Sequence, residues 1–301
     1  MIDQKLYTLL AVDKYKNYTK AAASLSLTQP AVSQHIRQIE NEMNVRLFNR
    51  SGNEIKTTTA GDLIIQYAQR NIALYENLHQ TILDEGKNIR RLTVGVTHTA
   101  ESNAVAEVLG KYSRKNPNTS ITIITDSINN LYRRLMNYEI DLAVVEGATH
   151  SDKINSLLLD TDSLVLVVSN NHPFAKKSRV TIDDLKKEPM ILRSSTSATR
   201  NLFAAHLESQ NLYLEDFHVI MEVDNIATIK DLIRRDVGIS ILPRSVCLDE
   251  LKKGKIAVLP IENLSMIREI NIVYNKDFQH TDILDTIIKD YNKVVKFYSS
   301  I

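Results

Sequence analysis

The sequence predicts an α/β protein with an all-α, winged N-terminal part, a long connecting helix and two α/β subdomains. Three observations lead to this prediction. The first 58 residues read as short amphipathic helices followed by a turn-rich stretch. Residues 59–88 contain no proline and read as one long helix. Beyond residue 90, near-continuous apolar strands alternate with amphipathic helices, the pattern of a parallel sheet covered on both faces.

A short helix over residues 28–40 has two different faces. Thr28 is an N-cap candidate, and Pro30 in the first turn loses no internal hydrogen bond because those N–H groups have no helical partner. Val32, Ile36 and Ile39 follow the spacing i, i+4, i+7 and form one apolar stripe. This face is predicted to pack on the rest of the N-terminal part.

The opposite face of this helix carries hydrogen-bonding side chains of graded length, namely Gln29, Ser33, Gln34 and Arg37. In a DNA major groove, Gln can pair with adenine and Arg with guanine through two hydrogen bonds each. An ordinary solvated helix surface would have a similar composition. The segments on either side favour DNA binding over that alternative.

The neighbouring segments complete a winged helix-turn-helix over residues 1–58. An apolar helix carries Leu6, Leu9 and Val12, and an alanine-rich helix follows over residues 18–25. A tight connection then leads into the polar-faced helix, which gives the order helix, turn, recognition helix. Residues 45–50 return apolar side chains to the core, and residues 51–58 are predicted to form a wing.

This run resembles the DNA-binding domain of the LysR-type transcriptional regulators. The matching pieces are AAASLSLTQPAVSQHIRQIE, RLFNR and TTAG, in the order and spacing of that family. Asn53 and Glu54 occupy wing positions that are often basic in the family, which weakens the case for phosphate contacts there. The candidate DNA-binding residues are Thr28, Gln29, Pro30, Ser33, Gln34, Arg37, Arg50 and Thr58.

The charge of the N-terminal part is modest. Residues 1–58 contain eight basic and five acidic residues, a net charge of +3, while the whole chain has a net charge of +1. Such a small positive charge predicts weak attraction of a single copy to DNA, and therefore binding by two copies together.

The long helix supplies an apolar seam that can join two copies. Its residues Ile64, Tyr67, Asn71, Leu74 and Leu78 are spaced alternately by three and four, as in a coiled coil. A buried Asn71 would fix the register and the number of partners. The seam could instead pack on the protein's own body, but a dimer explains the long helix better. We expect a homodimer or homotetramer, with residues 59–90 as the linker and dimerisation helix.

The composition predicts a cytoplasmic protein. Of the 301 residues, 43% are apolar and 24% charged, and no segment approaches the about 20 apolar residues of a membrane span. Met1 leads into an amphipathic helix rather than a signal peptide. The single cysteine, Cys247, excludes an internal disulfide and fits a reducing compartment. Its apolar neighbours indicate a buried, inert thiol rather than a redox sensor.

The basic segment over residues 87–91 marks a boundary, after which residues 91–301 form the effector-binding domain. The resemblance implies a periplasmic-binding-protein-like module, with subdomain I over residues 91–162 and 268–301 and subdomain II over residues 163–267. The chain would cross twice between them. Strands are expected over residues 92–96, 121–124, 140–145, 164–168, 190–192, 219–223, 237–243 and 268–274.

Open α/β sheets bind ligands beyond the carboxyl ends of their strands, here in the cleft between the two subdomains. Hydroxyls and N–H groups at helix N-termini suit an anion, and an arginine can bind one through two hydrogen bonds. N-caps, solvated loops and an ordinary surface histidine are the alternatives. The candidate ligand-binding residues are Thr97, His98, Thr99, Glu146, Arg193, Ser197, Thr199, Arg200 and Asn225.

One stretch of the cleft departs from the family. The segment Ile191–Arg200 resembles a stretch that is rich in Glu, Pro and Gly and ends in Ser-Gly-Thr-Arg. Here Ser194, Ser195, Thr196 and Ala198 occupy the Glu, Pro and Gly positions. The loop stays polar, but the resemblance does not predict a particular effector.

Other functional classes fit the sequence less well. An exported solute-binding protein would need an export signal and would lack the first 90 residues. The sequence contains no GxGxxG, Walker or HExxH motif, and eight histidines with one cysteine form no convincing site. We therefore expect no catalytic residue, no metal and no cofactor.

The sequence thus predicts a DNA-binding transcriptional regulator that is controlled by a small anionic metabolite. Double-stranded DNA, a second copy of the chain and this metabolite are its expected partners, RNA polymerase is considered as a further one, and no membrane is expected. The alternative is a small-molecule-binding protein or sensor whose DNA-binding role is secondary.

Overall fold

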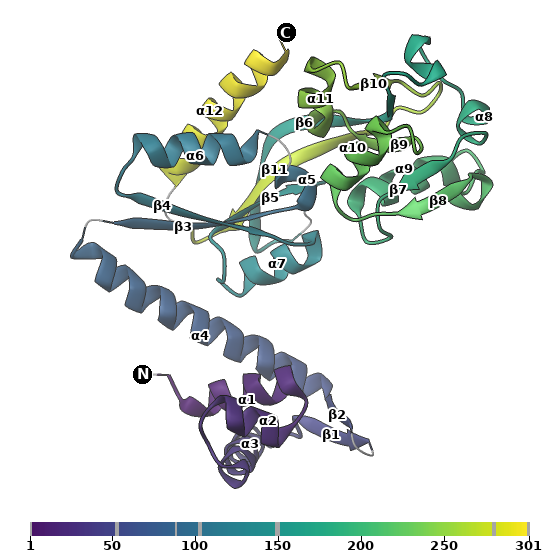
Figure 1. Cartoon of the computed structure of the whole chain (residues 1–301). Helices are drawn as coiled ribbons and strands as arrows, with labels where there is room; N and C mark the ends of the chain where they lie inside the picture. Colours follow the sequence, from purple (N-terminus) through teal and green to yellow (C-terminus); the bar gives the residue numbers. More distant parts are fainter. Residues whose placement is uncertain are drawn as a thin grey trace. The chain divides into compact units, whose positions relative to one another are not determined.

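The computed structural model describes residues 2–51, 54–87, 89–101, 104–147, 151–278 and 281–299 (Figure 1). The chain divides into two compact units. The first comprises residues 1–90 together with 133–139, and the second comprises residues 91–132 and 140–301.

The first unit contains three short helices, a two-stranded hairpin and one long helix, as the sequence predicts. Polar side chains start the helices: Asn17 accepts a hydrogen bond from the Lys20 amide, and Thr58 accepts one from the Gly61 amide. These oxygens satisfy N–H groups that a helix leaves unpaired. The elements are α1 (Gln4–Tyr15), α2 (Tyr18–Ser24), α3 (Gln29–Met43), β1 (Phe48–Ser51), β2 (Glu54–Thr57) and α4 (Thr59–Glu85).

One apolar core joins these elements. Leu9 and Val12 of α1, Val32 and Ile36 of α3, and Leu47 before the hairpin are almost completely buried. The hairpin pairs residues 48–51 with 54–57 in antiparallel register, so the wing starts three residues earlier than the predicted 51–58. Phe48 causes this difference, because its ring belongs to the core while its backbone already belongs to the strand.

Helix α4 has one face on this core and another exposed. Ile65, Ala68 and Ile72 are buried, whereas an apolar stripe remains exposed along the helix. The members of this exposed stripe are Leu63 (64% exposed), Tyr67 (67%), Leu74 (47%), Leu78 (57%) and Ile82 (61%).

The predicted seam on α4 is therefore only partly correct. Tyr67, Leu74 and Leu78 are exposed, but Ile64 is half-buried and packs against the core of the first unit. Asn71 donates its amide to the Tyr67 carbonyl of the same helix, at 2.9 Å. Ile64 is half-buried because it lies beside Ile65 and Ala68, where α4 packs on the core of the first unit.

Residues 133–139 also pack on α4 within the first unit. Asn137 is 1% exposed and donates to the Gln69 side chain at 2.8 Å, while its oxygen accepts from Arg70 Nε at 3.2 Å. Asn77 donates to the Tyr138 carbonyl at 2.9 Å. The long helix is thus held by polar contacts at its middle as well as by the core at its beginning.

The second unit is built on a mixed sheet with helices against it. Its described strands pair in the order β10-β6-β11-β5-β3-β4, with β9 joined to β6, and β7 pairs with β8. The strands are β3 (Arg90–Val96), β4 (Thr119–Thr125), β5 (Leu142–Glu146), β6 (Ile154–Ser169), β7 (Met190–Leu192), β8 (Val219–Glu222), β9 (Ser240–Pro243), β10 (Ile256–Leu259) and β11 (Ile267–Asn275).

Two long strands carry the chain between the subdomains (Figure 1). Strand β6 runs without interruption over 16 residues, where the sequence suggested a strand only over residues 164–168. Its first half pairs with β11 and its second half with β9 and β10, all in antiparallel register. The parallel pairing expected from the sequence is present between β3 and β5 and between β7 and β8. The polar residues 160–163 concealed the continuity of β6.

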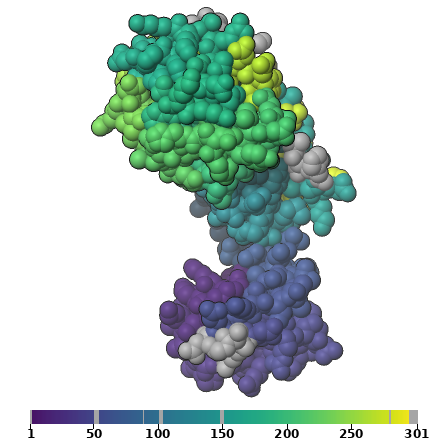
Figure 2. All heavy atoms as spheres, turned by 90° about the vertical axis from the view of Figure 1, so that its right-hand side faces the viewer, coloured from purple at the N-terminus to yellow at the C-terminus, as the bar shows by residue number. Residues whose placement is uncertain are grey.

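Each subdomain has its own apolar core. In subdomain I, α6 (Val105–Lys115) and α12 (Thr281–Ser299) pack on β3, β5 and β11. In subdomain II, α9 (Ala198–Glu208) packs on one face of β6, β7 and β9, and α10 (Ile226–Arg234) packs on the opposite face of the same strands. Figure 2 faces subdomain II, whose teal and green residues make one continuous surface there.

The shorter helices of the second unit are α5 (His98–Glu101), α8 (Ile182–Leu185) and α11 (Leu248–Lys252), while α7 (Ile128–Met136) begins in the second unit and ends in the first. Within the described residues, no helix combines the length and the apolar character that a membrane crossing requires.

Candidate functional site

Helix α3, the predicted recognition helix, is fixed at its first turn and along one face. The Thr28 hydroxyl accepts a hydrogen bond from the Ala31 amide at 3.3 Å, and Pro30 lies in the first turn, as predicted. Val32, Ile36 and Ile39 are buried. Because one face is anchored, the orientation of the opposite face is determined.

That opposite face is exposed and partly preorganised. Gln29 Nε2 donates to Ser33 Oγ at 2.9 Å, so these two predicted residues lie against each other. Gln34 and Arg37 are exposed. The structure therefore brings the four predicted polar side chains of α3 to one accessible helix surface.

A polar hollow of about 370 Å³ lies between α3 and the wing, lined among others by Ser33, Arg37 and Asn49. Glu40 also lines this hollow. The Glu40 Oε1 atom accepts a hydrogen bond from the Leu47 amide at 2.9 Å, and Glu40 Oε2 lies 3.5 Å from Arg46 Nη1. Glu40 thus ties the recognition helix to the start of the wing, a role that sequence reasoning missed.

Thr58 and Arg50 are the two predicted DNA-binding residues near the wing, and the structure describes the side chain of Thr58 only. The Thr58 hydroxyl donates to the Arg46 carbonyl at 2.5 Å and accepts from the Gly61 amide at 2.9 Å, so both of its functions are used within the protein. The Arg50 side chain lies outside the described part of the structure, although its backbone belongs to β1. DNA contacts by these residues stay predictions.

In the second unit, the predicted cleft residues of subdomain I gather where β3 and β5 end. The Thr97 hydroxyl donates to Glu146 Oε1 at 2.8 Å and accepts from the Ala100 amide at 3.0 Å. Thr97, Thr99 and Glu146 are all buried. Thr97 therefore orients Glu146.

The two arginines predicted in subdomain II already have acidic partners. Arg193 Nη2 lies 3.2 Å from Asp224 Oδ1, and Arg200 Nη1 lies 2.6 Å from Glu222 Oε1. The pKa of Asp224 is lowered, first by the hydrogen bond from Ser194 and then by Arg193 and by His98 of subdomain I.

The remaining predicted residues lie at helix starts. Ser197 is the N-cap residue of α9 but makes no side-chain cap hydrogen bond. The Thr199 hydroxyl accepts from Arg268 Nη1 at 3.4 Å. Asn225 caps α10 by accepting from the Thr228 amide at 3.1 Å, which is the N-cap alternative considered for it. A ligand contact by Asn225 stays a prediction.

Sequence reasoning missed Arg268 and Asp162, which occupy the crossover strands between the subdomains. They are partners in the β6–β11 register, and both are buried. Arg268 alternates in phase with the buried Ile270, while Ile267 and Glu269 are exposed. An arginine in phase with the apolar residues of a strand was the signal that could have identified it.

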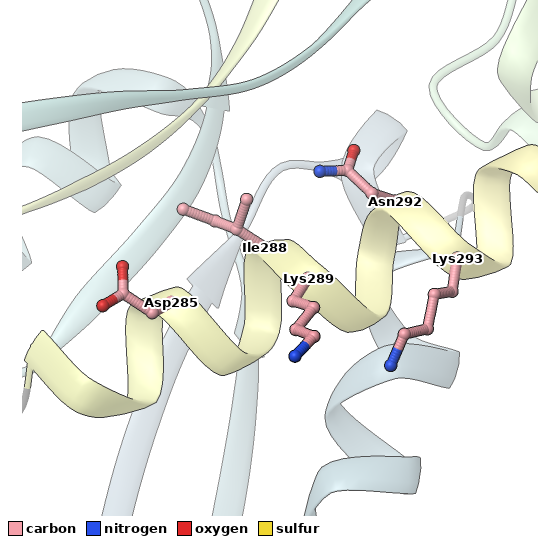
Figure 3. Close-up of a pocket in the computed structure, with 5 residues that line it drawn as sticks. All are labelled: Asp285, Ile288, Lys289, Asn292 and Lys293. Atoms are coloured by element: carbon pink, nitrogen blue, oxygen red, sulfur yellow. The ribbon is translucent and has the colours of Figure 1, made fainter.

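A second hollow, of about 430 Å³, lies along α12 and is lined by Asp285, Ile288, Lys289, Asn292 and Lys293. Figure 3 shows that all five residues project from this single helix. Groups from one helix do not converge on a ligand, and we assign no site there. The described residues also contain no group of acidic, histidine or cysteine side chains suited to a metal ion.

Comparisons with known proteins agree with this architecture. The family described as "Bacterial regulatory helix-turn-helix protein, lysR family" matches residues 4–62, and the family described as "LysR substrate binding domain" matches residues 85–289. The chain belongs to the LysR family of transcriptional regulators.

Relatives of this LysR-type regulator match it over nearly its whole length. A probable RuBisCO transcriptional regulator of Thalassiosira pseudonana is 30% identical over 288 residues, 94% of both chains. Full-length CbnR in complex with its target DNA has a TM-score of 0.69 at 17% identity, covering 97% of this chain and 99% of CbnR. The CcmR regulatory domain of Synechocystis in complex with 2-PG has a TM-score of 0.59 at 24% identity, covering 66% of this chain and 96% of that domain.

Proposed function

We propose that this LysR-type regulator binds specific double-stranded DNA through α3, acts as a homodimer or homotetramer, and responds to a small anionic metabolite in the cleft of its second unit. The exposed face of α3 carries the proposal. One side of this helix is locked in the core, and the other presents Gln29, Ser33, Gln34 and Arg37. Amide, hydroxyl and guanidinium groups on an exposed helix are the side chains that read base edges in a major groove.

The exposed stripe on α4 supports an oligomer. Five large apolar side chains, each at least 47% exposed, follow one line along the helix from Leu63 to Ile82. A contiguous apolar stripe of this kind favours burial against a second copy. Two copies would also add their small net positive charges on one DNA molecule.

The buried hydroxyls at the cleft support the effector. Thr99 and Ser197 come from opposite subdomains, are less than 10% exposed and begin helices. The CcmR regulatory domain was solved in complex with 2-PG, and this complex supports a small anionic effector in a domain of this fold. Binding of RNA polymerase stays a prediction from the sequence.

Selection of genomic DNA fragments by the purified chain, followed by footprinting, tests the proposal. We expect a few recurrent sites, protected on one face over successive helical turns and bound far more tightly than random DNA of equal length. Equal affinity for selected and random fragments at physiological salt would contradict the proposal.

A further inference from the structure

A buried charge cluster lies between the two subdomains, where Arg268 meets Glu146 and Asp162. The side chains of these three residues are only 6%, 4% and 5% exposed. Arg268 Nη2 lies 3.7 Å from Glu146 Oε1 and 3.6 Å from Asp162 Oδ2, which is beyond hydrogen-bond distance. Both Nε and Nη2 of Arg268 lack a hydrogen-bond partner among the described residues.

The two carboxylates do not come closer because other groups hold them. Glu146 Oε1 accepts from the Thr97 hydroxyl at 2.8 Å. Asp162 accepts from the Ser163 amide at 2.9 Å and from the amide and hydroxyl of Ser245 at 3.2 and 2.7 Å. These contacts orient the two carboxylates toward Thr97 and Ser245 and leave Nε and Nη2 of Arg268 unsatisfied among the described residues.

The two unpartnered nitrogens of Arg268 share one edge of the guanidinium plane. The Nε–H and Nη2–H bonds point in the same direction, and this edge matches the two oxygens of a carboxylate. Arg193 is different: its unpartnered atoms are Nε and Nη1, which do not share an edge, and its Nη2 is paired with Asp224. Arg268 is therefore the better carboxylate-binding residue.

The charge balance restricts the ligand further. The cluster holds two carboxylates and one guanidinium, so a plain carboxylate would add a third buried negative charge. Burial of an excess of like charge is unfavourable unless a donor compensates it. Among the described residues, the Glu146 carboxylate is contacted by Thr97 and Arg268 alone, so it can accept a hydrogen bond from a ligand donor next to the carboxylate.

We propose that the effector is a 2-amino or 2-hydroxy carboxylate, with its carboxylate on the Nε–Nη2 edge of Arg268 and its neighbouring ammonium or hydroxyl on Glu146. An ammonium group compensates the second carboxylate better than a hydroxyl does. This inference rests on one part of the proposed function, namely that the effector binds in the cleft of the second unit.

Matched trios of small carboxylates test the proposal on the full-length protein by thermal unfolding at equal ionic strength. Each trio differs only at the 2-position: acetate, glycolate and glycine; succinate, malate and aspartate; 3-phenylpropionate, phenyllactate and phenylalanine. We expect the donor-bearing members of at least one trio to raise Tm clearly more than the member without a donor.

Variants assign the effect to the two residues. Arg268→Gln should abolish the response. Arg268→Lys keeps the positive charge but lacks the two-donor edge, so it should weaken ligand binding at least tenfold. This second variant keeps the test valid if Arg268→Gln does not fold. Glu146→Gln should remove the preference for an amino over a hydroxyl group. Arg179→Gln, a change at an exposed arginine paired with Glu262, should respond like the wild type.

Three results would overturn the proposal. The first is a donor-free carboxylate that raises Tm as much as the donor-bearing members of its trio do. The others are an unchanged response in Arg268→Lys and no stabilisation by any member of the three trios. DNA selection by α3 is measured without these compounds. A failure of this inference is therefore distinguishable from a failure of the proposed function.

Discussion

Gly61 follows the wing of the first unit at a position where only a glycine fits. A Cβ atom at this position would lie 2.2 Å from the backbone oxygen of Leu47, so α4 can approach the segment before the wing only without a side chain there. The same Leu47 carbonyl accepts from the Thr58 amide, which begins α4. Thr58 and Gly61 of the TTAG segment therefore fix where the long helix starts.

Gly61→Ala should destabilise the first unit by about 1–3 kcal/mol, because the backbone of Leu47 must move to accept the methyl group. Faster hydrogen exchange of the α1–α3 amides would report this loss. Gly110→Ala is the matched control, since a Cβ there meets nothing within 4 Å inside helix α6. It should be neutral or stabilise by about 0.5–1 kcal/mol. Equal effects of the two changes would refute the role of Gly61.

A carboxylate on α12 links stability to pH. The pKa of Asp290 is lowered by hydrogen bonds from Lys115 and then Lys293. A lowered pKa in the folded state stabilises the fold above the ordinary carboxyl pKa of about 4, and this stabilisation disappears as the pH falls through the folded value. Because both lysines are more than 60% exposed, the contribution should be about 1 kcal/mol or less.

Asp290→Asn should therefore lower the free energy of unfolding at neutral pH, and its difference from the wild type should shrink below about pH 4. Urea unfolding at a series of pH values measures this difference. Asp285→Asn removes an exposed carboxylate from the same helix and should leave the curve unchanged. A deficit for Asp290→Asn that persists at the lowest pH would show that the contact is not electrostatic.

At the scale of residues, the sequence predicted what local patterns determine. Thr28 and Pro30 announced the start of α3, and Cys247 is buried, with its pKa raised by desolvation to about 12, as expected for an inert thiol. Arg268 could not be placed because its partners Glu146 and Thr199 are far away in the sequence. Their proximity depends on how the crossover strands meet the two subdomains.

Among the elements, α4 shows how packing selects the exposed face. Its buried residues Ile65, Ala68 and Ile72 fix the rotation of the helix on the first unit, and this rotation leaves Leu74 exposed. Periodicity alone predicted the helix but misplaced one edge of the seam, at Ile64. Strand β6 was the harder case, since its polar middle interrupts the apolar pattern although its backbone pairs on both sides of an irregularity at Leu159.

Leu74→Glu should dissociate the oligomer, because an ionised carboxylate would have no partner in an apolar interface. Light scattering at micromolar concentration measures the change, and DNA affinity should fall with it. Leu83→Glu is the matched control: Leu83 is 50% exposed and lies nine residues further on, about 180° around the helix. An oligomer that survives the first change but not the second would place the interface on the other face of α4.

In the whole molecule, effector binding and DNA binding should be separable. A ligand shifts a conformational equilibrium only through its different affinities for the two states. Removing a contact made only with the ligand should therefore abolish the response and leave DNA binding of the ligand-free protein unchanged.

Thr99→Val is such a change, because it is nearly isosteric and removes only the hydroxyl of a residue that is 6% exposed. We expect unchanged affinity for selected DNA without effector, and a lost or right-shifted response to the effector once metabolite screening has identified it. Thr122→Val, on an exposed position of β4, should respond normally. A normal effector response of Thr99→Val would remove this hydroxyl from the site.

Sequence-specific reading of DNA by α3 can be measured as the ratio of the affinities for selected and random DNA. Gln34→Ala should lower the affinity for selected DNA by about 1–3 kcal/mol and leave the affinity for random DNA nearly unchanged. Gln4→Ala, an identical truncation at an exposed position of α1, should change neither affinity. If Gln34→Ala weakens binding to selected and random DNA equally, or if Gln4→Ala has the same effect as Gln34→Ala, Gln34 does not read bases.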